Sequence, residues 1–207
     1  MDLFLVRHGE SLGNIVDYDC PDPELTDLGI KQAHLLAERL SVEKFDYILC
    51  SPLVRALETA WIVASHHDNQ PEVHIQLREI RGLQGHMGLP GKTLLERYPG
   101  IRLIDKVLED DQGWEDPGNE TREIGYLRTG SVVEYLKKRF TGDERILVVA
   151  HGTFNGLFIS SLLGLSPSGP IRFGQSNTCI NRFKIENDIC KVNCINDVSH
   201  LVSLKKL

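Results

Sequence analysis

The sequence predicts an α/β fold built around a mostly parallel β-sheet. Three short runs, at residues 3–6, 47–50 and 146–150, are almost wholly apolar. Such runs are typical of strands that are buried on both faces of a parallel sheet. Between and after them lie segments whose apolar residues recur with the period of a helix. This alternation indicates helices that pack on the faces of one sheet.

The first half of the chain gives the predicted elements in order. After the first strand, a loop runs through Cys20-Pro21-Asp22-Pro23, and Thr26 predicts the N-cap of a helix. The second strand spans about 45–50 and precedes a second helix. Residues 71–77 alternate between apolar and polar side chains, which predicts a strand near the sheet edge. The apolar stripes of the two helices are Ile30, Ala33, Leu36, Ala37 and Leu40, and Ala56, Leu57, Ala60, Ile62, Val63 and Ala64.

Residues from about 80 to 120 are predicted to form a cap-like insertion. Residues 81–91 are rich in glycine and are expected to form a loop, as are 109–111 and 115–120, while 93–98 suit a short helix. Long loops between strands often carry binding specificity. We therefore expect one domain over residues 1–207, with this insertion covering its active site.

The second half of the chain continues the alternation. A helix is expected over 121–140, with five apolar residues facing inward: Leu127, Val132, Val133, Leu136 and Phe140. After the strand that ends at Ala150, an apolar helix over 154–163 ends at Gly164. Residues 179–185 and 189–195 predict a pair of antiparallel strands that turn at Asn187-Asp188.

Composition and length bound the class of protein. A chain of 207 residues is long enough to bury roughly 70% of its unfolded surface in one core. The net charge of −6 argues against a nucleic-acid partner, which calls for a basic face. No run of 18 apolar residues occurs, so no membrane span is expected. The N-terminus enters a strand without a signal-like segment, which favours a cytoplasmic protein.

The cysteines favour a reducing compartment. There are five, at positions 20, 50, 179, 190 and 194, and an odd number without regular spacing is weak evidence for disulfides. Cys50 lies in an apolar strand and is expected to be buried. Cys190 and Cys194 lack a second pair that would suggest a zinc site.

Chemically useful side chains follow three of the predicted strands. Arg7 and His8 follow the first strand, His151 follows the strand that ends at Ala150, and Arg55 follows Ser51-Pro52 in the first turn of a helix. In open α/β sheets the ligand crevice lies at the carboxyl ends of the strands. A parallel sheet therefore brings two histidines and two arginines into one crevice.

These residue types suit a phosphoryl group. The guanidinium of arginine is a planar fork of donors that matches phosphate oxygens, and it stays charged at working pH. A neutral imidazole is a competent nucleophile. The helix that begins near Arg55 also points backbone N–H groups at the crevice. Gly9 is expected to let the backbone turn tightly and to avoid crowding a bound group.

Three segments resemble the signature segments of a known family. They are Val6-Arg7-His8-Gly9-Glu10-Ser11, Ser51-Pro52-Leu53-Val54-Arg55-Ala56-Leu57-Glu58-Thr59-Ala60 and Val149-Ala150-His151-Gly152. In this order they resemble the histidine phosphatase superfamily, the phosphoglycerate mutase-like proteins. The resemblance runs from residue 1 to about residue 185. It implies a three-layer α/β/α sandwich with a mostly parallel central sheet and an antiparallel strand at its edge.

The resemblance also implies a mechanism that needs neither a metal nor a cofactor. His8 attacks phosphorus to form a phosphohistidine, and the two arginines lower its pKa by like-charge repulsion and keep it neutral. His151 stabilises the phosphoryl oxygens. Glu79 protonates the leaving group and then activates water. The residues expected to bind the phosphate are Arg7, Asn14, Arg55 and the N–H groups near Gly152. The sequence departs from the common phosphatase pattern after Glu79, where it reads Ile80-Arg81-Gly82-Leu83.

The phosphatase branch is favoured over the mutases. Mutases usually carry a tryptophan before the asparagine, and Ser11-Leu12-Gly13-Asn14 lacks it. They also carry a histidine-tyrosine-glycine run where this chain has Ile80-Arg81-Gly82. The expected substrate is a small phosphorylated metabolite or a phosphoprotein, and the sequence selects neither a particular substrate nor an oligomeric state.

Two alternatives from other classes stay open. A metal-dependent hydrolase could use some of the eight histidines, but no HExxH motif occurs. Arginines beside His8 would also repel a divalent cation by several kcal/mol, at a distance of ~4 Å and an effective dielectric constant of about 20. A non-catalytic phosphate-binding protein of the same fold would be signalled by the loss of a histidine or of Glu79, and all of these residues are present.

Overall fold

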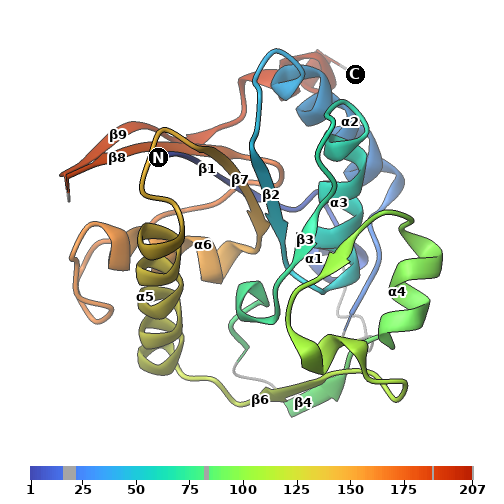
Figure 1. Cartoon of the computed structure of the whole chain (residues 1–207). Coiled ribbons are helices and arrows are strands. Elements are labelled where there is room, and N and C mark those ends of the chain that lie inside the picture. The colour runs from blue at the N-terminus through green and yellow to red at the C-terminus, as the bar shows by residue number, and fades with distance from the viewer. Residues whose placement is uncertain (16–21, 82–83, 188, 207) are drawn as a thin grey trace.

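The fold is organised by a seven-stranded sheet (Figure 1). The computed structural model describes residues 1–15, 22–81, 84–187 and 189–206. The strand order is β5-β3-β2-β7-β1-β8-β9, and the five strands from β5 to β1 are parallel. β8 and β9 add an antiparallel edge, as predicted. The bounds are β1 (Asp2–Arg7), β2 (Tyr47–Cys50), β3 (Glu72–Val73), β5 (Arg102–Leu103), β7 (Arg145–Ala150), β8 (Ile180–Glu186) and β9 (Ile189–Asp197).

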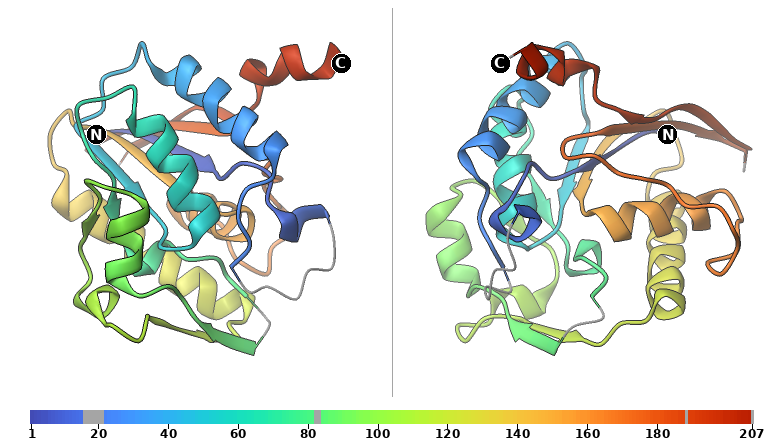
Figure 2. Two further views of the ribbon diagram at one scale, coloured as in Figure 1. Left: turned by 90° about the vertical axis from the view of Figure 1, so that its right-hand side faces the viewer. Right: turned by 180° about the vertical axis from the view of Figure 1, so that it is seen from behind.

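Helices cover both faces of this sheet, which confirms the predicted three-layer α/β/α class. α2 (Asp27–Leu40) and α3 (Val54–Ala64) lie on one face, and α5 (Arg122–Arg139) and α6 (Gly152–Leu162) lie on the other (Figures 1 and 2). A short α1 (Leu12–Ile15) follows β1, and η3 (Ser199–Lys206) ends the described chain beside α2. Among the described residues, no helix has the length and apolar character needed to cross a membrane.

The all-apolar strands arise because the sheet has a hydrophobic core on each face. In β1, Phe4 and Val6 pack into the core under α2 and α3, while Leu3 and Leu5 pack into the core under α5 and α6. All four side chains are buried. Each such side chain contributes roughly 1.5–3 kcal/mol when it is fully buried. A strand that faces two cores therefore has no polar face, as the sequence indicated.

Local signals for the helix ends are confirmed. The Oγ1 of Thr26 caps α2 by accepting a hydrogen bond from the Gly29 N–H at 3.0 Å. Gly164 follows α6 with a φ of +66°, the left-handed conformation that favours glycine at a helix end. Cys50 is buried, also as expected, and the cysteines that the structure describes are free thiols. Cys20 lies outside the described residues, as does Asp188 of the predicted hairpin turn.

Two predictions outside the site are wrong in detail. The strand expected over 71–77 is limited to β3, and η1 (Ile75–Leu77) follows it as a 3₁₀ turn. The Ile75 N–H donates to the Asp105 side chain at 2.7 Å, a tertiary contact that diverts the backbone from the sheet. Leu127 is 69% exposed, because the buried face of α5 follows Gly125, Thr129, Val132, Val133 and Leu136 instead.

The region from 80 to 120 has more regular structure than expected. β4 (Gln84–Met87) pairs antiparallel with β6 (Glu115–Gly118), so the predicted loops at 81–91 and 115–120 are partly wrong. α4 (Gly91–Arg97), β5 and η2 (Lys106–Glu109) lie between them, and β5 joins the main sheet. In Figure 1 the β4–β6 pair lies beyond the carboxyl ends of β2 and β7. Glycine is required here because a Cβ on Gly88 would overlap the buried Trp114 ring.

Candidate active site

The ends of three adjacent parallel strands form the site. β7 lies between β2 and β1, with Cys50 opposite Val149 and Arg7 opposite Ala150. The chain therefore places the next residues of the three strands, Ser51, His151 and His8, side by side. All three are buried. This is the crevice at the carboxyl edge of the sheet that the sequence predicted.

Hydrogen bonds to both ring nitrogens define the tautomer of His8. Its Nδ1 lies 2.6 Å from the Gly9 carbonyl oxygen, which can only accept. Its Nε2 lies 3.2 Å from the Arg55 Nε, which can only donate. Nδ1 therefore carries the proton, and Nε2 presents its lone pair. The ring is fixed in the form that a nucleophile requires.

The surroundings of His8 keep it neutral. Burial lowers its pKa well below 6.5, and the charges of Arg55 and Arg7 lower it further, while the hydrogen bond to Gly9 opposes them. The side chain is 2% exposed. The sequence-based expectation named the arginines as the cause, and in the structure burial is the larger one.

Arg55 is held by a carboxylate that the sequence did not reveal. Arg55 is the second residue of α3, and its Nη1 lies 3.5 Å from the Asp22 Oδ1. The same carboxylate accepts the Val54 N–H at 2.9 and 3.1 Å. Burial raises the pKa of Asp22 to about 6, and the nearby Arg55 charge only partly offsets this. Burial also lowers the pKa of Arg55 to about 10, so the guanidinium remains charged at neutral pH.

Arg7 ends β1 and retains a free donor. Its Nη1 donates to the Gln175 carbonyl at 2.6 Å, while its Nε is buried without a hydrogen-bond partner among the described residues. Gly152 lies against it, since a Cβ there would be 3.4 Å from the Arg7 Nε. A buried, unpaired guanidinium N–H is costly unless a ligand accepts from it.

His151 faces the nucleophile from the end of β7. Its ring centroid lies 5.1 Å from that of His8. Its Nε2 is 2.8 Å from the Ser51 Oγ, and its Nδ1 is buried without a partner in the described chain. Burial lowers its pKa well below 6.5, with the Arg55 charge as the second cause.

Glu79 lies at the N-terminus of α6. Its Oε1 accepts the N–H groups of Ile80 at 2.8 Å and Phe154 at 2.9 Å, and its Oε2 accepts the Thr153 N–H at 3.3 Å. The donors next to Gly152 are thus bound to Glu79, although they were expected to assist phosphate binding. Arg128 of α5 supports this segment by donating to the Gln76, Arg78 and Glu79 carbonyls.

Asn14 lies in α1 and is exposed. Its Oδ1 accepts from the Ser11 N–H at 3.1 Å, the Ser11 hydroxyl at 3.2 Å and the Asn177 amide at 3.2 Å. Its side-chain amide nitrogen makes no hydrogen bond to any residue in the described ranges, while its backbone N–H donates to the Ser11 carbonyl. The orientation of Asn14 therefore leaves a donor available.

Gly9 is required for a reason other than the expected one. A Cβ at this position would lie 2.5 Å from the Gly29 carbonyl oxygen. The glycine thus allows α2 to pack directly on the segment after His8. A side chain at this position would collide with α2, whereas the expectation was that it would crowd a bound group. The Gly9 N–H also donates to the Thr59 hydroxyl of α3 at 3.1 Å.

One cavity connects several of these residues. Arg7, Glu79 and Gly152 line it together, with a volume of about 330 Å³. This lies near the lower end of the roughly 300–1,000 Å³ range for small-molecule sites. Its other lining residues are Arg122, Thr153, Gly156, Arg172, Phe173 and Gln175.

Comparison with known proteins agrees with this arrangement. The model of the histidine phosphatase superfamily (branch 1) matches residues 3–198. The chain belongs to this superfamily. Its members are phosphatases and mutases that use a catalytic histidine.

The related histidine phosphatases include enzymes of both kinds. The chain is 28% identical to the "Probable phosphoglycerate mutase GpmB" of Yersinia pestis over 194 residues, which cover 88% of this chain and 84% of that protein. It is similar in structure to a phosphoserine phosphatase from Entamoeba histolytica in complex with 3-phosphoglyceric acid, with a TM-score of 0.70, 26% identity and coverage of 97% and 99%. A mycobacterial glucosyl-3-phosphoglycerate phosphatase in complex with VO3 gives a TM-score of 0.67, 25% identity and coverage of 94% and 98%.

Sequence reasoning missed several residues around this superfamily site. Ser51 was quoted in a motif without a role, and Asp22 and Arg128 were not singled out. Arg81, which marked the departure after Glu79, acts electrostatically on Arg55. Only Ser51 carried a signal, because it directly follows a strand that ends at the site. The other contacts are between residues far apart in the sequence.

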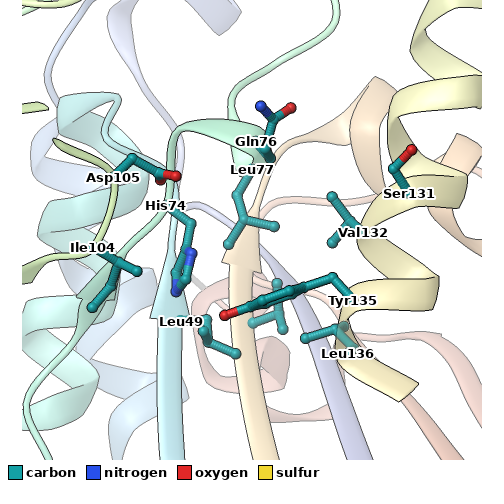
Figure 3. Close-up of a pocket in the computed structure, with 11 residues that line it drawn as sticks. Leu49, His74, Gln76, Leu77, Ile104, Asp105, Ser131, Val132, Tyr135 and Leu136 are labelled. Atoms are coloured by element: carbon teal, nitrogen blue, oxygen red, sulfur yellow. The ribbon is translucent and has the colours of Figure 1, made fainter. Parts of the chain in front are cut away.

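A second cavity lies between α5 and the middle of the sheet (Figure 3). It has a volume of about 220 Å³ and is lined mainly by apolar side chains, including Leu49, Leu77, Val132, Leu136 and Val148. His74 and Tyr135 face each other across it, with ring centroids 5.8 Å apart. None of the predicted site residues lines it.

Proposed function

We propose that this histidine phosphatase is a phosphomonoester hydrolase that works through a phosphohistidine on His8. The observation that carries the proposal is the pair of hydrogen bonds to the ring. Gly9 fixes the proton on Nδ1, and Arg55 lies at Nε2. The lone pair of a neutral imidazole is thus held next to a cation that attracts a phosphoryl oxygen.

The surrounding donors suit a phosphoryl group that is transferred from the substrate oxygen to the His8 nitrogen. Negative charge spreads over three equatorial oxygens in such a transfer, and fixed donors stabilise it. Arg7 offers its buried Nε, and Arg55 offers its guanidinium. The Ser51 hydroxyl accepts from the Leu53 N–H and can donate to the His151 Nε2. In that tautomer the His151 Nδ1 carries a proton that a phosphoryl oxygen accepts.

Glu79 is the proton donor in this proposal. Its Oε2 has a single long hydrogen bond, at 3.3 Å, so this oxygen is the one that carries the proton. After the alcohol leaves, the carboxylate draws a proton from the water that attacks the phosphohistidine. The amide of Asn14 and the Gly152 N–H add neutral donors.

Hydrolysis is favoured over transfer to a second hydroxyl. The structural relatives described above are phosphatases, although the Yersinia pestis relative is named as a mutase. This chain lacks the tryptophan before Asn14 and the histidine-tyrosine-glycine run after Glu79 that mutases usually carry. The substrate is proposed to be a small phosphorylated metabolite, such as the phosphorylated ligand bound by the Entamoeba histolytica enzyme.

A turnover assay with defined phosphomonoesters tests the proposal. We expect release of inorganic phosphate from alkyl and aryl phosphates, activity that persists in EDTA, and inhibition by vanadate. His8→Ala is the matched inactive control. Activity that is lost on chelation and restored by zinc or manganese would instead support a metal-dependent hydrolase. Phosphoryl transfer to a second hydroxyl, dependent on a mutase cofactor, would support a mutase, and no turnover at all would support a phosphate-binding protein.

A further inference from the structure

The cavity beside Glu79 contains two arginines that the proposed mechanism does not use. Arg122 begins α5, and Arg172 lies in the segment between α6 and β8. They line the same cavity as Arg7 and Glu79, although they are far apart in the sequence. Three cations and one carboxylate thus face this space in a chain whose net charge is −6.

Backbone carbonyls hold both arginines in place. The Arg122 Nε donates to the Pro167 carbonyl at 2.8 Å. The Arg172 Nη1 donates to the Ile171 carbonyl at 2.8 Å and also to the Gly169 carbonyl. These contacts use only part of each fork of five donors. Because the side chains are already anchored, an anion that binds them pays less for ordering them.

Nearby carboxylates offset the charges of Arg122 and Arg172 only in part. Among the described residues, neither Arg122 nor Arg172 forms an ion pair. Burial lowers the pKa of Arg122, and the charge of Arg172 lowers it further, while Glu123 opposes this. The two cations that line the cavity therefore repel each other. A bound anion would relieve this repulsion.

The position of the pair relative to the reaction defines what it would bind. In an in-line transfer the nucleophile and the leaving oxygen lie on opposite sides of phosphorus. The proton donor must therefore lie on the leaving-group side. Since Glu79 lines this cavity with Arg122 and Arg172, the released alcohol occupies the same space.

We infer that the preferred substrate is a small phosphomonoester whose alcohol portion carries a second oxyanion, and that Arg122 and Arg172 bind this group. The inference rests on the proposed function, because it uses Glu79 to locate the leaving group. The arginine fork matches a carboxylate or a phosphate with two parallel hydrogen bonds. The cavity, at about 330 Å³, suits a small alcohol of this kind.

The test compares substrates that differ only in the second group. We would measure kcat/KM at about 0.15 M salt, which screens distant charges beyond roughly 8 Å, for 3-phosphooxypropanoate, its amide and propane-1,3-diol bisphosphate. The wild-type protein should prefer one of the two charged substrates over the amide by ~10-fold or more, since charge-assisted hydrogen bonds are stronger than neutral ones. The carboxylate and bisphosphate results distinguish the two oxyanions.

Substitutions then locate the preference. Arg122→Gln and Arg172→Gln should each lower the ratio of charged to amide substrate by ~3–10-fold, and the double variant should bring it near one. Arg39→Gln is the matched control, because it removes an exposed arginine on α2 outside the cavity and should leave the ratio unchanged. Thermal unfolding checks that each variant is folded. If Arg122→Gln does not fold, Arg172→Gln alone still tests the site.

The outcomes separate this inference from the proposed function. If phosphomonoesters are hydrolysed in a His8-dependent manner but the wild-type protein does not prefer either charged substrate, the second-oxyanion site is wrong and the hydrolase proposal stands. A preference that both Gln variants retain would also overturn the site. If no phosphomonoester is hydrolysed, both are wrong.

Discussion

The apolar cavity and the candidate active site lie close together along the same strands and differ in chemistry. Leu49 and Val148 are opposite each other in β2 and β7 and line the apolar cavity under α5 (Figure 3). Two or three residues further along the same strands, Ser51 and His151 lie in the candidate active site. The middle of a strand is surrounded by helices, whereas its carboxyl end opens onto a crevice where Arg7 of β1 and Arg55 of α3 supply cations. We therefore expect changes at the first cavity to alter stability and changes at the site to alter turnover.

The largest expected difference concerns Glu79. A proton donor matters most when the leaving group is a poor one, so Glu79→Gln should slow alkyl phosphate turnover by ~10²–10⁴. The phosphorylation step with p-nitrophenyl phosphate should be nearly unaffected, because the phenolate leaves without protonation. Rapid-mixing measurements of the burst separate this step from dephosphorylation, which lacks its base in the variant.

Glu109→Gln is the matched control for this prediction, because Glu109 is the exposed last residue of η2 and does not line the arginine-lined cavity. It should leave both substrates unchanged. Equal losses in the burst for alkyl and aryl phosphates in Glu79→Gln would mean that Glu79 only shapes the site. Asp116, which is buried and 3.5 Å from Arg78, would then be the next donor to test, before the exposed Asp110 and Asp111.

A smaller loss is expected from Arg55→Lys. Lysine keeps the charge but lacks the planar fork that donates to His8 and also approaches Asp22. Loss of one well-placed donor should lower kcat by ~10²-fold. Arg97→Lys, at a partly exposed ion pair with Glu24, is the control and should change kcat less than twofold. If both variants had the same kcat, the Arg55 fork would have no catalytic importance.

The buried histidines should make stability depend on pH. His8 has a pKa well below 6.5 when folded and near 6.5 when unfolded. Below pH 6.5 the unfolded chain binds a proton that the folded chain does not. The free energy of unfolding therefore falls by about 1.4 kcal/mol for each pH unit that the pH is lowered, for each such histidine. Asp22, with a folded pKa of about 6, acts in the opposite direction.

Comparing variants isolates the contribution of His8. Urea unfolding gives the free energy of unfolding of the wild-type protein and of His8→Gln at each pH. Between pH 6.5 and the lowered pKa of folded His8, its slopes against pH should differ by about 1.4 kcal/mol per pH unit, with the variant less sensitive to acid. Asp22 and His151 are present in both proteins, and burial, the main cause of each of their pKa shifts, is common to both. Parallel slopes would show that His8 is not held neutral by the fold.

The smallest effect is expected at the apolar cavity. Val132→Ile adds one methylene next to a space of about 220 Å³. Filling it should stabilise the fold by up to about 0.8 kcal/mol and leave turnover unchanged. Val133→Ile is the control, since Val133 is buried on the same helix but does not line the cavity. It should instead destabilise the fold by about 1 kcal/mol or more through overpacking. A change in turnover for Val132→Ile would contradict the separation between the apolar cavity and the active site.

The sheet and its helices could be predicted because local patterns determine them. The wholly apolar strands, the Thr26 cap and Gly164 each reflect a contact within one element or its two faces. The convergence of His8 and His151 followed from strand direction alone. Their hydrogen bonds did not, because the tautomer of His8 depends on Arg55, which approaches from another element.

Residues 80–120 could not be predicted because their structure depends on distant partners. β4 becomes a strand only by pairing with β6, and Gly88 is explained only by Trp114. Leu127 was predicted to face inward because it is apolar, yet the elements that pack against α5 determine which of its faces is buried. Asp22, Arg122 and Arg172 had no sequence signal, since each acts through a neighbour far along the chain.

Direct detection of the phosphoenzyme tests the central proposal. Protein quenched during turnover of phosphorus-labelled substrate should carry one acid-labile, base-stable phosphoryl group. Mass spectrometry should place it on His8, and nuclear magnetic resonance should place it on Nε2, the nitrogen that the hydrogen bond to Gly9 leaves unprotonated. His8→Ala should remove the label, while His151→Ala should keep it and slow turnover. A label that survives His8→Ala, or that lies on Nδ1 or on another residue, would contradict the proposal.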